Sequence, residues 1–92
     1  MENMKEKEKI AVALKYEKGD EAPEIVASGR GILAEKIINT AVEADVPTYE
    51  DKKLAKTLAA LEVGDLIPPE LYGVVAEILV FVDNMDKIKN KI

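Results

Sequence analysis

The chain has 92 residues, a formal net charge of −5, and neither cysteine nor histidine. Its length allows one small domain, and an apolar content of 48% excludes intrinsic disorder. Without cysteine there is no disulfide or thiolate metal site, and without a long apolar stretch or a basic face we expect a cytoplasmic domain that neither inserts into a membrane nor binds nucleic acid.

The N-terminal residues 1–9 are mostly charged and show no apolar periodicity, which predicts a flexible leader or one or two solvated helical turns. Residues 10–16 follow at once and are apolar on both faces, which favours a strand inside a sheet. No glycine, proline or asparagine marks the junction. A strand that begins so abruptly raises the question of what precedes it.

A second strand is predicted within residues 22–29. Pro23 has no amide hydrogen to donate, so it belongs where the strand begins, and Ile25 and Val26 form the strand itself. The polar loop 17–21 contains Gly19 as its turn residue. We expect the two strands to form an antiparallel hairpin.

Residues 32–44 have the wide apolar stripe of a helix that lies on a sheet. Residues 46–50 are short and rich in β-forming residues, which predicts a third strand. A strand, a helix and a strand in this order predict a right-handed crossover between parallel strands.

Two further helices complete the prediction. Asp51 suits the N-cap of a helix that contains Leu54, Leu58 and Leu61. Residues 67–70, Ile-Pro-Pro-Glu, suit the first turn of the last helix, and residues 84–92 are a helix extension or a frayed tail. The predicted core face of this helix comprises Leu71, Val74, Val75, Ile78, Leu79 and Val82. The predicted fold is α/β, with a small mixed sheet of about three strands, one βαβ crossover and about three helices, in one domain over residues 10–83.

Catalytic chemistry finds little support. The absence of histidine removes the commonest general base and zinc ligand, and Ser28, the only serine, has no evident base. Gly29-Arg30-Gly31 lacks the rest of a phosphate-binding motif and is interpreted as a turn. The acidic residues are spread over the chain and form no calcium-binding loop. We predict no catalytic residue, no metal and no cofactor.

Four short motifs occur in one order along residues 10–82. Together they resemble the cytoplasmic C-terminal domain of the FlhB-type flagellar and type III export switch proteins. Each motif alone is weak, but four in register are specific. They are Ala11-Val12-Ala13-Leu14-Lys15-Tyr16, Ala22-Pro23-x-Ile25-Val26-Ala27-x-Gly29, Val46-Pro47 and Ile67-Pro68-x-Glu70-Leu71-Tyr72-x-x-Val75-Ala76-Glu77-Ile78-Leu79.

The resemblance implies an answer to the abrupt first strand. Proteins of that family cleave themselves between Asn and Pro of an Asn-Pro-Thr-His turn directly before this strand. Here the turn falls on Glu6-Lys7-Glu8-Lys9, and all four residues differ. We expect a stand-alone copy of the downstream fragment that does not cleave itself and lacks the membrane part and the preceding strand. The first strand would then leave a sheet edge open for strand addition, at Ile10, Val12, Leu14 and Tyr16.

The resemblance also implies a function. The family domain is thought to receive export substrates on an apolar patch, which falls here on Ala22, Pro23, Ala76 and Leu79, although these residues could equally be ordinary core or loop positions. We expect a non-enzymatic interaction module, a monomer or weak dimer, whose partners are export apparatus proteins and export substrates. The alternative is a structural or self-associating scaffold of the same fold without a role in export. The sequence leaves open whether the system is flagellar or an injectisome.

Overall fold

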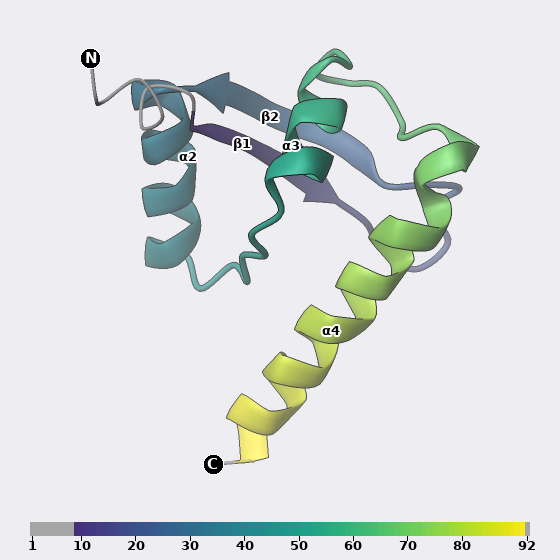
Figure 1. Ribbon diagram of the computed structural model, residues 1–92. Helices are drawn as coiled ribbons and strands as arrows, with labels where there is room; N and C mark the ends of the chain where they lie inside the picture. Colours follow the sequence, from purple (N-terminus) through teal and green to yellow (C-terminus); the bar gives the residue numbers. More distant parts are fainter. Residues whose placement is uncertain (1–8, 92) are drawn as a thin grey trace.

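The computed structural model describes the backbone of residues 9–91 and the side chains of residues 9–81. Its centre is an antiparallel hairpin of two strands, β1 (Ile10–Lys15) and β2 (Glu24–Arg30) (Figure 1). Ile10 lies opposite Arg30, and the register shifts by one residue where Val26 bulges out of β2. The predicted hairpin is confirmed.

Two turns of the same sequence pattern flank β2. In the connection from β1 to β2, Gly19 adopts a φ of 95°, which favours glycine, and Asp20 donates its backbone N–H to the carbonyl of Glu17 (2.9 Å). The Asp20 carboxylate accepts the N–H of Glu17 in return (2.9 Å). Residues 62–65, Glu-Val-Gly-Asp, repeat this arrangement with Gly64 at a φ of 100°.

The second turn places residues 64–67 along the outer edge of β2. Gly64 donates its N–H to the carbonyl of Ile25 (2.7 Å), and Ile25 donates to the carbonyl of Asp65 (2.9 Å). Ile67 donates to the carbonyl of Pro23 (3.0 Å). This part of the β2 edge is therefore covered, although residues 64–67 form only an isolated bridge between Leu66 and Glu24.

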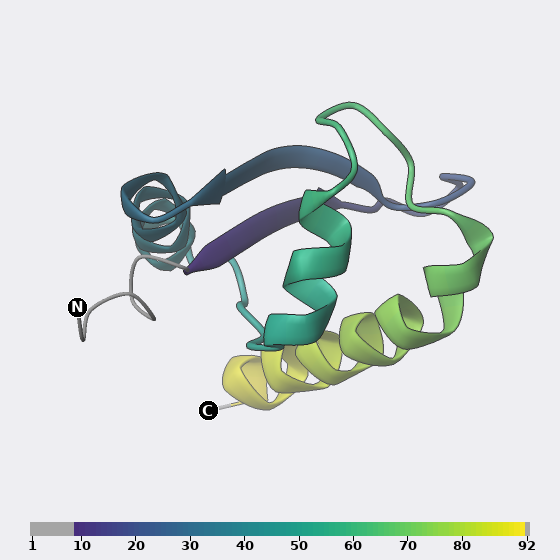
Figure 2. The same ribbon diagram turned by 45° about the horizontal axis from the view of Figure 1, so that its top comes forward.

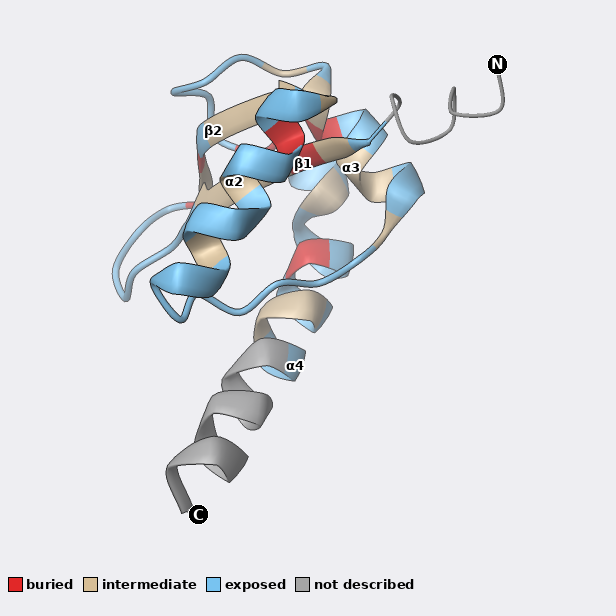
Figure 3. Cartoon of the chain, turned by 90° about the vertical axis from the view of Figure 1, so that its left-hand side faces the viewer, coloured by how far each residue is buried: buried red, intermediate tan, exposed pale blue. Residues whose placement is uncertain are grey.

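Helix α2 (Ile32–Glu43) crosses one end of the hairpin (Figures 1 and 2). Gly31, at a φ of 59°, turns the chain from β2 into the helix. Ala34, in the first turn of α2, is fully buried. Most of α2 is nevertheless exposed, as Figure 3 shows, and Ile32 reaches 85% exposure. The predicted helix is confirmed, but the hairpin covers only a small part of its apolar stripe.

Helices α3 (Lys52–Ala59) and α4 (Tyr72–Lys91) build the main core with Val12 and Leu14 of β1 (Figure 2). Asp51 caps α3, as predicted, because its Oδ1 accepts the N–H of Leu54 (3.0 Å). A short 3-10 turn, η1 (Pro69–Leu71), leads directly into α4. The core contains Ala22, Leu58, Ile67 and Val75, with Val12, Leu14, Leu54, Leu61, Leu71 and Leu79 packed around it.

The predicted third strand and its crossover are wrong. Residues 46–50 pair with no strand within residues 9–91, and the sheet described there contains only β1 and β2, which are antiparallel. Val46 instead donates its N–H to the carbonyl of Ala41 at the end of α2 (2.8 Å). The fold is α/β as predicted, with a two-stranded sheet and three helices in the described residues.

One predicted boundary lies mostly outside the described part of the chain. Of the leader at residues 1–9, only Lys9 is described, and its Nζ lies 3.6 Å from a carboxylate oxygen of Glu35 on α2. This pair is exposed, so it contributes little to stability. Val82, predicted to continue the core face of α4, lies beyond the described side chains.

Candidate functional site

A shallow hollow of about 210 Å³ lies between the β1–β2 connection, the segment before η1, and one face of α4. We call it the Pro23 hollow. Its floor is apolar, because Ile67 and Val75 are both only 2% exposed. Its lining residues are Tyr16, Glu21, Pro23, Ile67, Tyr72, Val75, Ala76 and Leu79.

Local sequence explains why these side chains converge. Pro23 lies just before β2, where its missing N–H leaves no ladder bond unmade, and its carbonyl accepts from Ile67. Proline at residue 69 starts η1 and sets the direction of α4. Positions 72, 75, 76 and 79 follow at intervals of three, four and seven residues, so their side chains share one helix face.

Three of the four residues predicted for substrate docking line this hollow together. Pro23 is buried at its base, Ala76 is exposed, and Leu79 is half-buried. Ala22 does not line the hollow, because it is 3% exposed and packs in the core. The geometry therefore brings Pro23, Ala76 and Leu79 to one surface and places Ala22 beneath it, and docking itself stays a prediction.

No predicted site included Glu21 or Tyr72, and Tyr16 was predicted to lie at the open sheet edge. All three line the Pro23 hollow. Tyr72 could have been found, because it lies four residues before Ala76 on the same helix face. Glu21 could not, since its place depends on how the β1–β2 connection folds back over α4.

The outer edge of β1 is the second predicted site. The carbonyl of Lys9 accepts the N–H of Gly31 across the hairpin (2.8 Å). Hydrogen-bonded positions alternate along an antiparallel pair, so the backbone groups of Ile10 and Val12 point away from β2. No strand within residues 9–91 pairs with this edge.

The same holds beyond the bulge. Ile25, opposite Leu14, uses both of its backbone groups on residues 64 and 65, so the backbone of Leu14 also faces the outer edge. Tyr16 lies past the end of β1 and lines the Pro23 hollow instead. Ile10, Val12 and Leu14 thus present outward-facing backbone groups, with half-buried side chains.

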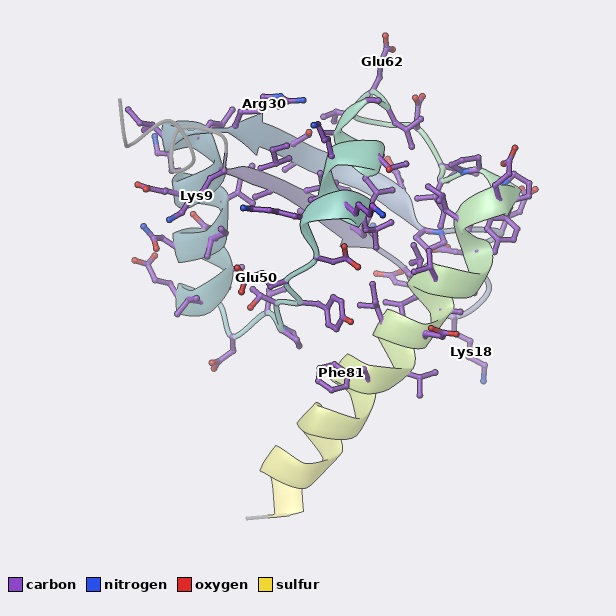
Figure 4. All side chains as sticks on the ribbon, in the orientation of Figure 1. Lys9, Lys18, Arg30, Glu50, Glu62 and Phe81 are labelled. Carbon is purple, nitrogen blue, oxygen red and sulfur yellow. The ribbon has the colours of Figure 1, made fainter. Side chains whose placement is uncertain are left out.

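A second hollow of about 440 Å³ lies on another side of α4. Tyr49 and Phe81 meet there edge to face, with ring centroids 5.6 Å apart. In Figure 4, Phe81 points from α4 toward the α2–α3 connection, while Lys18 lies on the other side of the helix. The lining residues are Tyr49, Asp51, Val74, Glu77, Ile78 and Phe81.

Neither hollow offers a metal centre. In the part of the chain that is described, no three acidic side chains gather as ligands for an ion. The described helices are also too short or too polar for any of them to span a bilayer. The arrangement is that of a small α/β domain with two surface hollows beside α4.

Comparisons with known proteins identify the group to which this domain belongs. A sequence model of the FlhB HrpN YscU SpaS family matches residues 7–82, and the chain belongs to this family. The chain is 46% identical to the uncharacterized protein YlqH of Bacillus subtilis, over 96% of this chain and 99% of that protein. It is 44% identical to the flagellar biosynthetic protein FlhB of Aquifex aeolicus, over 79% of this chain.

The chain spans only about a fifth of the length of FlhB (21% of the Aquifex protein). Among solved structures, the PscU C-terminal domain superposes with a TM-score of 0.75 at 25% identity, and covers 79% of this chain and 95% of that domain. The predicted resemblance is therefore confirmed, and it concerns the C-terminal domain of these proteins. The relatives of known function are flagellar biosynthetic proteins, of which this chain matches one domain.

Proposed function

We propose that this chain is a non-enzymatic interaction module of the export apparatus, which acts in the cytoplasm and receives a short apolar segment of an export substrate in the Pro23 hollow. The observation that supports the proposal is that Pro23, Ala76 and Leu79, from distant parts of the chain, line one hollow. Such docking would give the chain a role in export or in switching between export substrates.

The chemistry of the hollow suits this role. At about 210 Å³ it is smaller than the ~300–1,000 Å³ typical of small-molecule sites, and it fits one or two side chains of a protein segment. Ala76 is small, so the surface is indented there, and Leu79 supplies an apolar wall. The absence of histidine and cysteine from the sequence favours binding without covalent chemistry.

The proposal is tested by Ala76→Asp, alone and with Pro23→Ser. Ala76 is exposed, so circular dichroism should show an intact fold, while a carboxylate in the hollow must lose water when an apolar segment docks. We expect binding of early flagellar export substrates to fall about tenfold or more. Val80→Asp is the matched control, because Val80 is 60% exposed on the same helix and lines neither hollow.

Unchanged binding by Ala76→Asp would remove the hollow from the proposed function. A collapsed fold would show that Ala76 is a core position. Equal loss in Ala76→Asp and Val80→Asp would point to a general effect of charge on α4.

The open edge of β1 supports a second contact with the same apparatus. We propose that it accepts a strand from a full-length export switch protein. Self-association is less favourable, because antiparallel pairing of two copies centred on Val12 places Lys9 of each copy opposite Lys15 of the other. This argues for a monomer or weak dimer rather than a self-associating scaffold.

A further inference from the structure

We propose that the Pro23 hollow selects a segment in which an arginine lies next to the apolar anchor residue. This deepens the proposed function and rests on it, since it names the kind of segment that the hollow receives. The residues responsible are Tyr16, Glu21 and Tyr72, which we call the rim of the hollow.

The charge of the lining is the first reason. Glu21 is the only charged residue among the lining residues, and no lysine or arginine is among them. Its side chain is exposed and takes part in no ion pair in the described part of the chain. Lys18, in the same connection, does not line the hollow. A docked segment therefore meets one uncompensated negative charge.

The two tyrosines are the second reason. Tyr16 is 48% exposed and Tyr72 is 40% exposed, so much of each ring surface is open to a ligand. Tyr16 and Glu21 come from the β1–β2 connection and Tyr72 from the start of α4, and these segments lie next to each other in Figures 1 and 2. Aromatic faces and a carboxylate around one opening are a set of groups that attracts a cation.

Arginine fits this set better than lysine. Its guanidinium is planar, stacks on aromatic rings and bonds a carboxylate through two N–H groups. The floor of Ile67 and Val75 and the apolar wall of Leu79 meanwhile take the neighbouring aliphatic or aromatic side chain. An acidic residue at the same position would face Glu21 and be rejected by repulsion between like charges.

The experiment uses overlapping 15-residue peptides that tile a flagellar hook protein, with a second set in which every arginine and lysine is glutamine. Binding of both sets is measured by fluorescence anisotropy to the wild-type chain and to Glu21→Gln, Glu21→Lys and Ala76→Asp. Glu17→Gln is the matched control, because it removes the same charge from the same connection and does not line the hollow.

We expect Glu21→Gln to weaken the arginine-containing peptides about fivefold, as an accessible ion pair predicts, and Glu21→Lys to weaken them further. The glutamine peptides should bind weakly and equally to wild type and Glu21→Gln, and Glu17→Gln should behave as wild type. The difference between wild type and Glu21→Gln should shrink as salt is raised.

The two proposals fail differently. If peptides bind, Ala76→Asp abolishes binding, and Glu21→Gln leaves arginine-containing peptides unaffected, the choice of arginine is overturned and docking stands. If Ala76→Asp changes nothing, or no peptide binds, docking in the hollow is overturned and the selection of arginine with it. Equal effects of Glu17→Gln and Glu21→Gln on peptide binding would show that only the net charge of the protein matters. This outcome would overturn the role of the rim.

Discussion

Replacing Gly29 by alanine tests how closely α2 approaches the hairpin. A Cβ atom at Gly29 would lie 2.7 Å from Cδ2 and 2.9 Å from Cβ of Leu33. Carbon atoms are ordinarily at least about 3.5 Å apart in packed interiors, so α2 must retreat by roughly half an ångström. Rotating the Leu33 side chain is not enough, because its Cβ is fixed to the helix backbone.

The size of the effect follows from two opposing terms. Overpacking of this kind destabilises a domain by about 1–3 kcal/mol. Alanine in place of glycine restricts the unfolded chain, which offsets about 0.4–1 kcal/mol. We expect a net loss of roughly 0.5–2 kcal/mol in the free energy of unfolding, with a fall in Tm of about 4–8 °C for each kcal/mol in a domain of this size.

Thermal and urea denaturation followed by circular dichroism measures this loss. Gly73→Ala is the matched control: nothing lies within 4 Å of a Cβ there and the residue is inside α4, so stability should rise by about 0.5–1 kcal/mol. Adding Leu33→Ala to Gly29→Ala should recover part of the loss, because the atoms beyond the Leu33 Cβ are removed. A Gly29→Ala protein as stable as wild type would refute the close approach of α2.

Three other predictions concern the start of α3, the core and the N-terminal region. Asp51→Ala should lower the free energy of unfolding by about 0.5–2 kcal/mol, since the N–H of Leu54 loses its cap, and Asp51→Asn should lose much less; equal losses would contradict capping. Ile67→Ala should cost about 2–5 kcal/mol, because Ile67 is 2% exposed in the core, and a loss below 1 kcal/mol would mean a loose core. The chain should keep its intact mass during long incubation at neutral and mildly alkaline pH, because no asparagine precedes a proline and histidine is absent; two fragments split between residues 5 and 10 would show self-cleavage.

Elements fixed by neighbouring residues could be predicted from the sequence. Pro23 and Gly19 marked the hairpin, because proline restricts the backbone where the strand begins and glycine permits the left-handed turn conformation. Asp51 and Pro69 likewise marked the starts of α3 and η1, because a cap and a first-turn proline act on the adjacent turn. Each of these residues acts within a few positions of itself, so no knowledge of the tertiary structure was needed.

The prediction of a third strand was wrong because strand formation depends on a partner that is distant in the sequence. Val46, Thr48 and Tyr49 favour extended backbone, but a strand also needs a neighbour with free hydrogen-bonding groups. Residues 46–50 pair with no strand in the described structure, although the outer edge of β1 is free, and the Tyr49 ring packs on Phe81 of α4 instead. Val74, predicted as core, is 37% exposed and lines the second hollow. The apolar stripe of α4 is wider than the surface available to cover it.

The docking residues show the same division. Ala76 and Leu79 could be placed together from helical spacing alone, but Ala22 and Pro23 are adjacent in sequence and differ in surroundings, with Ala22 in the core and Pro23 in the hollow. Glu21, which carries the charge of the rim, lies in a loop whose path no local pattern specifies. Charge selection in the hollow was therefore invisible before the fold was known.

The exposed half of α2 and the open edge of β1 have one geometric cause. The 12 residues of α2 make a helix about 18 Å long, while two strands about 4.8 Å apart form a sheet roughly 10 Å wide. The helix starts beside the end of β2 and runs past β1 (Figure 1). Its first turns therefore cover the hairpin, where Ala34 is buried, and its last turns overhang β1, where Val42 is 62% exposed and Ile38 is 37% exposed.

A strand added beside β1 would lie beneath the last turns of α2. It would therefore contact the open edge of β1 and the exposed side chains of α2 together. Mixing the chain with the upstream fragment of a full-length export switch protein should raise its Tm and slow amide hydrogen exchange at Ile10, Val12 and Leu14, whose backbone groups face outward. Ile38→Asp should weaken this binding, since the added strand would then face a carboxylate, and should leave docking in the Pro23 hollow unchanged. Ile32→Asp is the control, because Ile32 is 85% exposed at the other end of α2. Binding that tolerates Ile38→Asp would place the strand elsewhere, and a homodimer protected at the same three amides would mean that a second copy takes the edge despite the facing lysines.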